Sequence, residues 1–121
     1  MNAIAIHPVI ESLRALLPHA NVLVRDEDLR PYECDGLSVY RELPLTVVIP
    51  ETEEQVAAVL RTCQKHRVAV IARGAGTGLS GGARPSRDAV LMSLAKLNRI
   101  IEIDPLARTA RVGPGVRNLA V

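Results

Sequence analysis

The sequence is poor in aromatic residues: it has no Trp and no Phe, and its two Tyr are Tyr32 and Tyr40. Domains that bind single-stranded nucleic acid stack the bases on aromatic side chains. The 15 Lys and Arg nearly balance the 13 Asp and Glu, which leaves a net charge of +2 and no run of basic residues. A phosphate backbone is bound by a concentration of positive charge. We therefore exclude RNA-recognition and OB-type modules and expect no nucleic-acid partner.

Long apolar runs are also missing. The longest, such as residues 68–72, have five residues, whereas a membrane-spanning helix needs about twenty. The N-terminus carries no basic leader and reaches Pro8 and Glu11 too soon for a signal peptide. We expect a cytoplasmic protein without a membrane span, which reaches the inner membrane, if at all, through partner subunits. Cys34 and Cys63 lack the spacing of a metal or redox motif, so we predict two reduced thiols and no metal site.

The remaining composition is that of a folded protein, with 48% hydrophobic and 23% charged residues in 121 positions. This length fits one domain and is too short for two. Near the N-terminus, residues 7–17 place apolar side chains on one helical face. We also predict an extended piece at 22–24, a helical turn capped by Asp26 and a loop over residues 32–41. We group residues 1–44 as an N-terminal helix and lead-in loop.

The pattern is clearer from residue 45 onward. Residues 45–49 form a β-branched run between two prolines, which predicts a short buried strand. Thr52 and Gln55 have the spacing of a capping box at the start of a helix that ends near His66. The apolar stripe predicted for this helix consists of Val56, Val59, Leu60 and Cys63.

Strand patterns dominate the rest of the chain. Residues 68–72 predict a second buried strand, which completes a strand-helix-strand unit with the segment before it. Residues 88–94 predict another strand, and residues 99–104 and 109–112 predict a hairpin around a four-residue turn. The fold class is therefore α+β. We group residues 45–121 as one subdomain.

A glycine-rich stretch covers residues 73–83, where five of the eight glycines lie within nine positions. Without side chains, backbone amides can converge on an anion that approaches the main chain closely. Thr77 and Ser80 add hydroxyl donors, and Arg73 adds a positive charge. We predict a phosphate or pyrophosphate ligand. The alternative is a connecting loop that binds nothing.

Two common nucleotide-binding motifs do not account for this stretch. Residues 76–81 match the G-x-G-x-x-G pattern, but that motif works through a helix that begins at its last glycine. Here residues 82–87 lead into a strand pattern instead. A Walker P-loop is excluded because no Gly-Lys-Ser or Gly-Lys-Thr follows.

The chain resembles FAD-linked oxidases and dehydrogenases of the vanillyl-alcohol-oxidase type, and among them the FAD-binding subunits of bacterial glycolate oxidases. Four stretches carry the resemblance: residues 31–38, 44–50, 73–83 and 111–119. The resemblance implies the N-terminal part of an FAD-binding domain whose glycine loop cradles the pyrophosphate. It implies noncovalent FAD, because the loop has no His to which the flavin could be attached. The residues that it assigns to the cofactor are Arg73, Gly74, Ala75, Gly76, Thr77, Gly78, Ser80, Gly81, Gly82 and Gly115.

The resemblance also implies an activity. Such enzymes oxidise a small 2-hydroxy acid, such as glycolate or D-lactate, by hydride transfer from the α-carbon to the flavin N5. Electrons then pass to further oxidase subunits, including an iron-sulfur subunit. No catalytic residue is expected in this chain, which we expect to be truncated at its C-terminus and inactive alone. The alternative is a stand-alone nucleotide-binding or interaction module without redox activity.

Overall fold

The computed structural model describes residues 7–34, 41–75, 83 and 85–121. Its helices and strands follow the predicted order closely, including the N-terminal helix, the strand-helix-strand unit and the hairpin. The α-helices and strands are α1 (Pro8–Leu16), β1 (Val22–Leu23), α2 (Asp26–Leu29), β2 (Thr46–Val48), α3 (Glu53–Lys65), β3 (Ala69–Arg73), β4 (Ala89–Ser93), β5 (Ile100–Asp104) and β6 (Thr109–Val112). Short 3₁₀ turns cover His19–Asn21, Arg30–Tyr32 and Asn118–Ala120.

The main sheet has four strands in the order β1-β2-β4-β3. Strands β2, β4 and β3 run parallel, and β1 pairs with β2 in the antiparallel direction. The predicted unit of β2, α3 and β3 is present, but β4 lies between its two strands. All five residues of β4 are buried, as expected for a strand with parallel neighbours on both sides.

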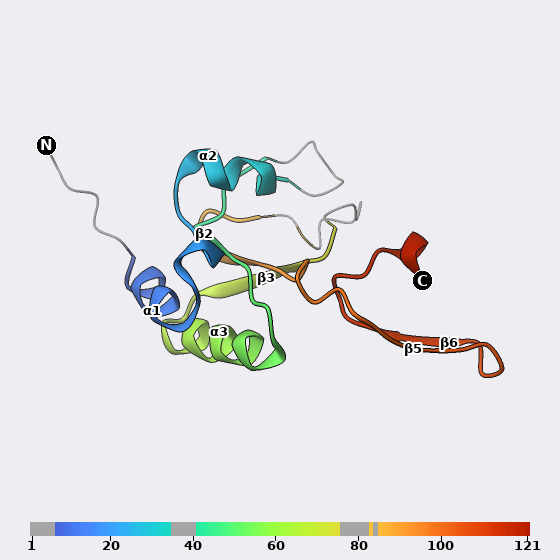
Figure 1. Cartoon of the computed structure of the whole chain (residues 1–121). Helices are drawn as coiled ribbons and strands as arrows, with labels where there is room; N and C mark the ends of the chain where they lie inside the picture. The colour runs from blue at the N-terminus through green and yellow to red at the C-terminus, as the bar shows by residue number, and fades with distance from the viewer. Residues whose placement is uncertain (1–6, 35–40, 76–82, 84) are drawn as a thin grey trace, which may run out of the picture.

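Helices cover both faces of this sheet. Helices α1 and α3 lie on one face and α2 lies on the other (Figure 1). The alternation of side chains along the strands produces this division. Val48 and Val90 pack in the cluster that contains residues of α1 and α3, whereas Val47 and Leu91 pack with Leu29 of α2.

Strand β3 is less buried than the sequence predicts. It stands at the end of the sheet, where it pairs with β4. Ala69 and Ala72 are exposed, and the other three residues are half-buried. The prediction was wrong because β4 takes the central place and leaves β3 with a neighbouring strand on one side. An apolar run in the sequence does not say which strand is central.

Helix α3 has well-defined ends. The Thr52 hydroxyl accepts a hydrogen bond from the Gln55 amide at 3.1 Å, as the capping box predicts. The Gln55 side chain accepts from the Glu51 amide at 2.7 Å, one residue before the expected partner. At the other end, Arg67 has φ 56°, and its amide donates to the Gln64 carbonyl while the Val68 amide donates to the Cys63 carbonyl. These two bonds form a Schellman motif.

Two smaller predictions need correction. Val59 and Cys63 are fully buried, but Leu60 is 46% exposed, so the apolar stripe of α3 is narrower than predicted. The cap of α2 is Arg25 rather than Asp26, and no side chain caps that helix. Instead, Arg25 forms ion pairs at 3.0 Å with the carboxylates of Glu27 and Asp28. Of the predicted loop 32–41, residues 35–40 lie outside the described residues.

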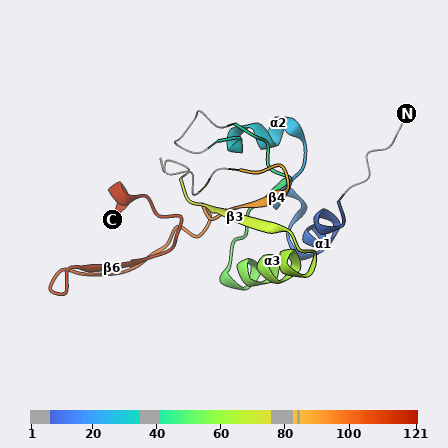
Figure 2. The ribbon, with the colours of Figure 1, turned by 180° about the vertical axis from the view of Figure 1, so that it is seen from behind.

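The hairpin of β5 and β6 extends away from the main sheet (Figures 1 and 2). Its strands pair in the antiparallel direction around the predicted turn, with an irregularity between Ile100 and Glu102. The Asp104 carboxylate accepts hydrogen bonds from the amides of Leu106 and Ala107 at 3.1 Å and thereby fixes the turn. Both strands are largely exposed.

Candidate functional site

The glycine-rich stretch begins where β3 ends. Gly74 and Ala75 directly follow Arg73, the last residue of β3. Residues 76–82, which include the predicted Gly76, Thr77, Gly78, Ser80, Gly81 and Gly82, lie outside the described residues. The structure therefore describes the start of the predicted site, together with Gly115.

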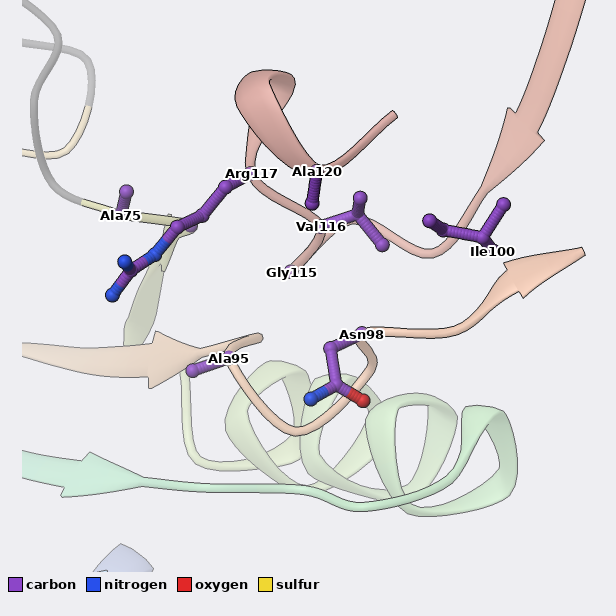
Figure 3. Close-up of a pocket in the computed structure, with 9 residues that line it drawn as sticks. Ala75, Ala95, Asn98, Ile100, Gly115, Val116, Arg117 and Ala120 are labelled. Carbon is purple, nitrogen blue, oxygen red and sulfur yellow. The ribbon is translucent and has the colours of Figure 1, made fainter.

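A pocket of about 410 Å³ opens beside this start. Its lining brings Gly74 and Ala75 together with Gly115, which lies some forty positions later in the chain (Figure 3). The described residues that line it are Gly74, Ala75, Ala95, Asn98, Ile100, Gly115, Val116, Arg117 and Ala120. This volume lies within the range of small-molecule sites, about 300–1,000 Å³. The sequence-predicted residues that the structure describes thus share one pocket, with the exception of Arg73.

The Gly113-Pro114-Gly115 turn packs tightly against the segment that follows β4. A Cβ at Gly113 would lie 2.2 Å from the Leu97 carbonyl oxygen, and a Cβ at Gly115 would lie 2.3 Å from that of Leu94. The Gly115 amide also donates to the Leu97 carbonyl at 2.9 Å. Gly115 was assigned by resemblance to the nucleotide, but the protein's own backbone already requires glycine there.

Arg73 does not line the pocket. Its guanidinium donates a hydrogen bond from Nη1 to the Cys34 carbonyl at 2.7 Å and lies 5.2 Å from the centroid of the Tyr32 ring. Both contacts are favourable for a half-buried guanidinium. They join the end of β3 to the segment after α2. These contacts hold the guanidinium of Arg73 beside the segment after α2.

Sequence reasoning missed two polar residues of the pocket, Asn98 and Arg117. Arg117 is the one charged residue among the described residues that line it, and its side chain extends toward Ala75 (Figure 3). It belongs to the stretch 111–119 that carries the family resemblance, which was the available signal. Small residues, a cation and no carboxylate stand in the part of the lining that the structure describes, and this combination fits a diphosphate group.

Two histidines make contacts within the fold. Nδ1 of His7 accepts from the Val9 amide at 3.2 Å and caps α1. Nε2 of His66 lies 3.1 Å from the Ser12 hydroxyl, which joins α3 to α1. Both cysteines are free, and burial raises the pKa of the Cys63 thiol. Over the described ranges, no group of acidic, His or Cys side chains could hold a metal ion.

Known proteins resemble this chain closely. Glycolate oxidase subunit GlcD of Escherichia coli is 53% identical over 113 residues, which cover 93% of this chain and 23% of that protein. The D-2-hydroxyglutarate dehydrogenase of Stutzerimonas stutzeri is 33% identical over 89% of this chain and 23% of its own length. A solved structure of p-cresol methylhydroxylase with substrate bound matches with a TM-score of 0.78 at 36% identity, over 89% of this chain and 22% of its own. The chain spans about a quarter of the length of these relatives.

The fold is that of a flavin-nucleotide-binding domain of the vanillyl-alcohol-oxidase type, which confirms the predicted α+β class. Residues 44–121 match the family model described as an FAD binding domain. The chain belongs to this family, and its cofactor is FAD. None of the helices in the described part of the chain is long and apolar enough to cross a membrane.

Proposed function

We propose that this chain forms the first cofactor-binding part of an FAD-dependent oxidoreductase that converts a small 2-hydroxy acid, glycolate or D-lactate, to the 2-oxo acid. The observation that carries the proposal is the 53% identity to a glycolate oxidase subunit over nearly the whole chain. A second relative is named for a reaction of another 2-hydroxy acid. Nothing comparable supports a stand-alone module without redox activity.

The proposed role of this chain is to bind and orient the cofactor. Residues 74–81 form the cradle for the diphosphate, with Arg73 and Gly82 at its ends, and their glycines leave the diphosphate oxygens in contact with backbone amides. Ala75 and Gly115 contribute to the wall of the adjoining pocket. FAD is held without a covalent bond, because the glycine stretch offers no His. Residues 45–121 act as one subdomain in this role.

When bound, FAD supplies the acceptor for the two electrons that leave the substrate. The α-carbon of the hydroxy acid loses a hydrogen with both electrons, and its hydroxyl group loses a proton, so that a carbonyl group forms. The base that takes this proton lies outside this chain. The residues of this chain bind and position the cofactor, and the proton transfer belongs to other parts of the enzyme.

The proposal extends to partner subunits. Relatives of this chain are named as subunits, among them the flavoprotein subunit of 4-cresol dehydrogenase from Pseudomonas putida. We accordingly place this chain in a multi-subunit oxidase. An iron-sulfur subunit is the electron acceptor in this proposal, and the protein is cytoplasmic, with any membrane contact made through its partners.

A visible absorption spectrum tests this function. The protein expressed from its complete gene should be yellow, with flavin bands that bleach on anaerobic addition of glycolate or D-lactate. L-lactate, which has the same groups in mirror-image arrangement, is the matched control substrate. A colourless protein that takes up no FAD would refute the proposal. Flavin that binds but stays oxidised with either acid would favour the module without redox activity.

A further inference from the structure

The diphosphate of FAD carries negative charge that a protein site must offset, and the described residues offer two candidate cations near the glycine stretch. Arg73 is the candidate that the sequence suggests. Its guanidinium, however, is already engaged by the Cys34 carbonyl at 2.7 Å and by the ring of Tyr32. It is also absent from the lining of the pocket. An arginine that is held in this way has little freedom to turn toward a ligand.

Arg117 is in the opposite situation. It lines the pocket together with Gly74 and Ala75, and its guanidinium reaches toward the end of β3 (Figure 3). Within the part of the chain that the structure describes, its guanidinium has no hydrogen bond or ion pair. The charge therefore remains available for a ligand in the pocket.

The backbone at Arg117 is fixed although its side chain is exposed. The Val116 amide donates to the Gly113 carbonyl at 3.2 Å, and the Ala120 amide donates to the Arg117 carbonyl at 2.9 Å. The Gly113-Pro114-Gly115 turn before it is held as well, because the Gly115 amide donates a hydrogen bond to the Leu97 carbonyl. A guanidinium on an anchored backbone loses less conformational freedom on binding than one on a mobile tail.

We propose that Arg117 supplies the positive charge for the FAD diphosphate, while Arg73 acts as a positioning residue for the glycine stretch. This inference rests on the proposed function and deepens it. The ligand chemistry is that of an oxyanion. A diphosphate is favoured over a substrate carboxylate because Arg117 shares its pocket with Gly74 and Ala75 of the glycine stretch.

The experiment compares two variants that each remove one positive charge. Arg117→Gln removes the proposed ligand, and Arg61→Gln removes an exposed arginine of α3 that does not line the pocket. Each protein is expressed from the complete gene and stripped of flavin, and then FAD and ADP are titrated separately. ADP carries the diphosphate without the flavin. Circular dichroism shows that the variants are folded.

We expect Arg117→Gln to weaken the binding of FAD and of ADP by similar factors, each about tenfold, because a charge-assisted contact to phosphate is lost. Arg61→Gln should bind both as tightly as the unaltered protein. Arg117→Lys keeps the charge and should recover part of the affinity. It also keeps the test decisive should Arg117→Gln fold poorly.

The results distinguish a failure of the proposed function from a failure of the role proposed for Arg117. An unaltered protein that takes up no FAD overturns the proposed function and this inference together. If the unaltered protein binds FAD and both Gln variants bind it equally well, only the role of Arg117 is wrong. A raised KM for glycolate with unchanged affinity for FAD and ADP would assign Arg117 to the substrate carboxylate and overturn the diphosphate role.

Discussion

Replacement of Gly115 by Ala provides a quantitative test of the packing at the pocket. The added Cβ would lie 2.3 Å from the Leu94 carbonyl oxygen and 2.9 Å from that of Ala95. Both atoms belong to the backbone, so the segment after β4 has to move. Overpacking of this kind costs about 1–3 kcal/mol. With a cost of about 2 kcal/mol, the midpoint of urea unfolding should fall by about 1 M.

Gly74→Ala is the matched control for this substitution. Its added Cβ would lie 3.4 Å from the Pro114 carbonyl oxygen, which is an ordinary van der Waals distance. Reduced freedom of the unfolded chain should make this variant as stable as the unaltered protein or more stable, by up to about 1 kcal/mol. Equal unfolding midpoints for the two variants would refute the argument that the backbone near Leu94 requires Gly115.

Three further predictions concern the glycine stretch, the end of α3 and its buried thiol. Gly76→Val should abolish flavin retention, because a β-branched side chain would fill the proposed phosphate space; normal FAD content in a folded variant, measured by absorbance, would contradict this. Arg67→Gly should raise the free energy of unfolding by about 1 kcal/mol in a denaturant titration, since φ 56° is costly for a residue with a Cβ; an unchanged or lower value would count against it. Burial raises the pKa of Cys63 above 9.0, so the unfolded thiol ionises first. Stability should therefore fall as the pH rises through and above that value, and Cys63→Ala should lose this component of the pH dependence.

Local structure was well predicted from the sequence because local rules determine it. The Thr52 cap of α3 depends on a bond between residues three positions apart. The turn between β5 and β6 depends on Asp104 and the next few amides. Such contacts form between near neighbours in the chain, and residue type and spacing are enough to indicate them.

The order of the strands depends on long-range contacts that the same rules do not contain. An apolar run at 68–72 indicates a strand but does not say that β4 will take the central place. Long-range contacts also distinguish the surroundings of Arg73 from those of Arg117. Arg73 begins the glycine-rich stretch in sequence but contacts Tyr32 and Cys34, whereas Arg117 is distant in sequence and lines the pocket. Three-dimensional proximity decides which of them is free to meet a ligand.

The central position of β4 also has a consequence for synthesis. On the ribosome β2 and β3 emerge first, yet the strand that joins them side by side comes only after residue 88. Until then the backbone edges of β2 and β3 that pair with β4 have no partner, and nascent chains with unpaired strand edges tend to associate wrongly. The glycine-rich stretch lies in the connection between β3 and β4. A protease cut within that connection would sever the middle strand from β3 and leave each fragment with only part of the sheet.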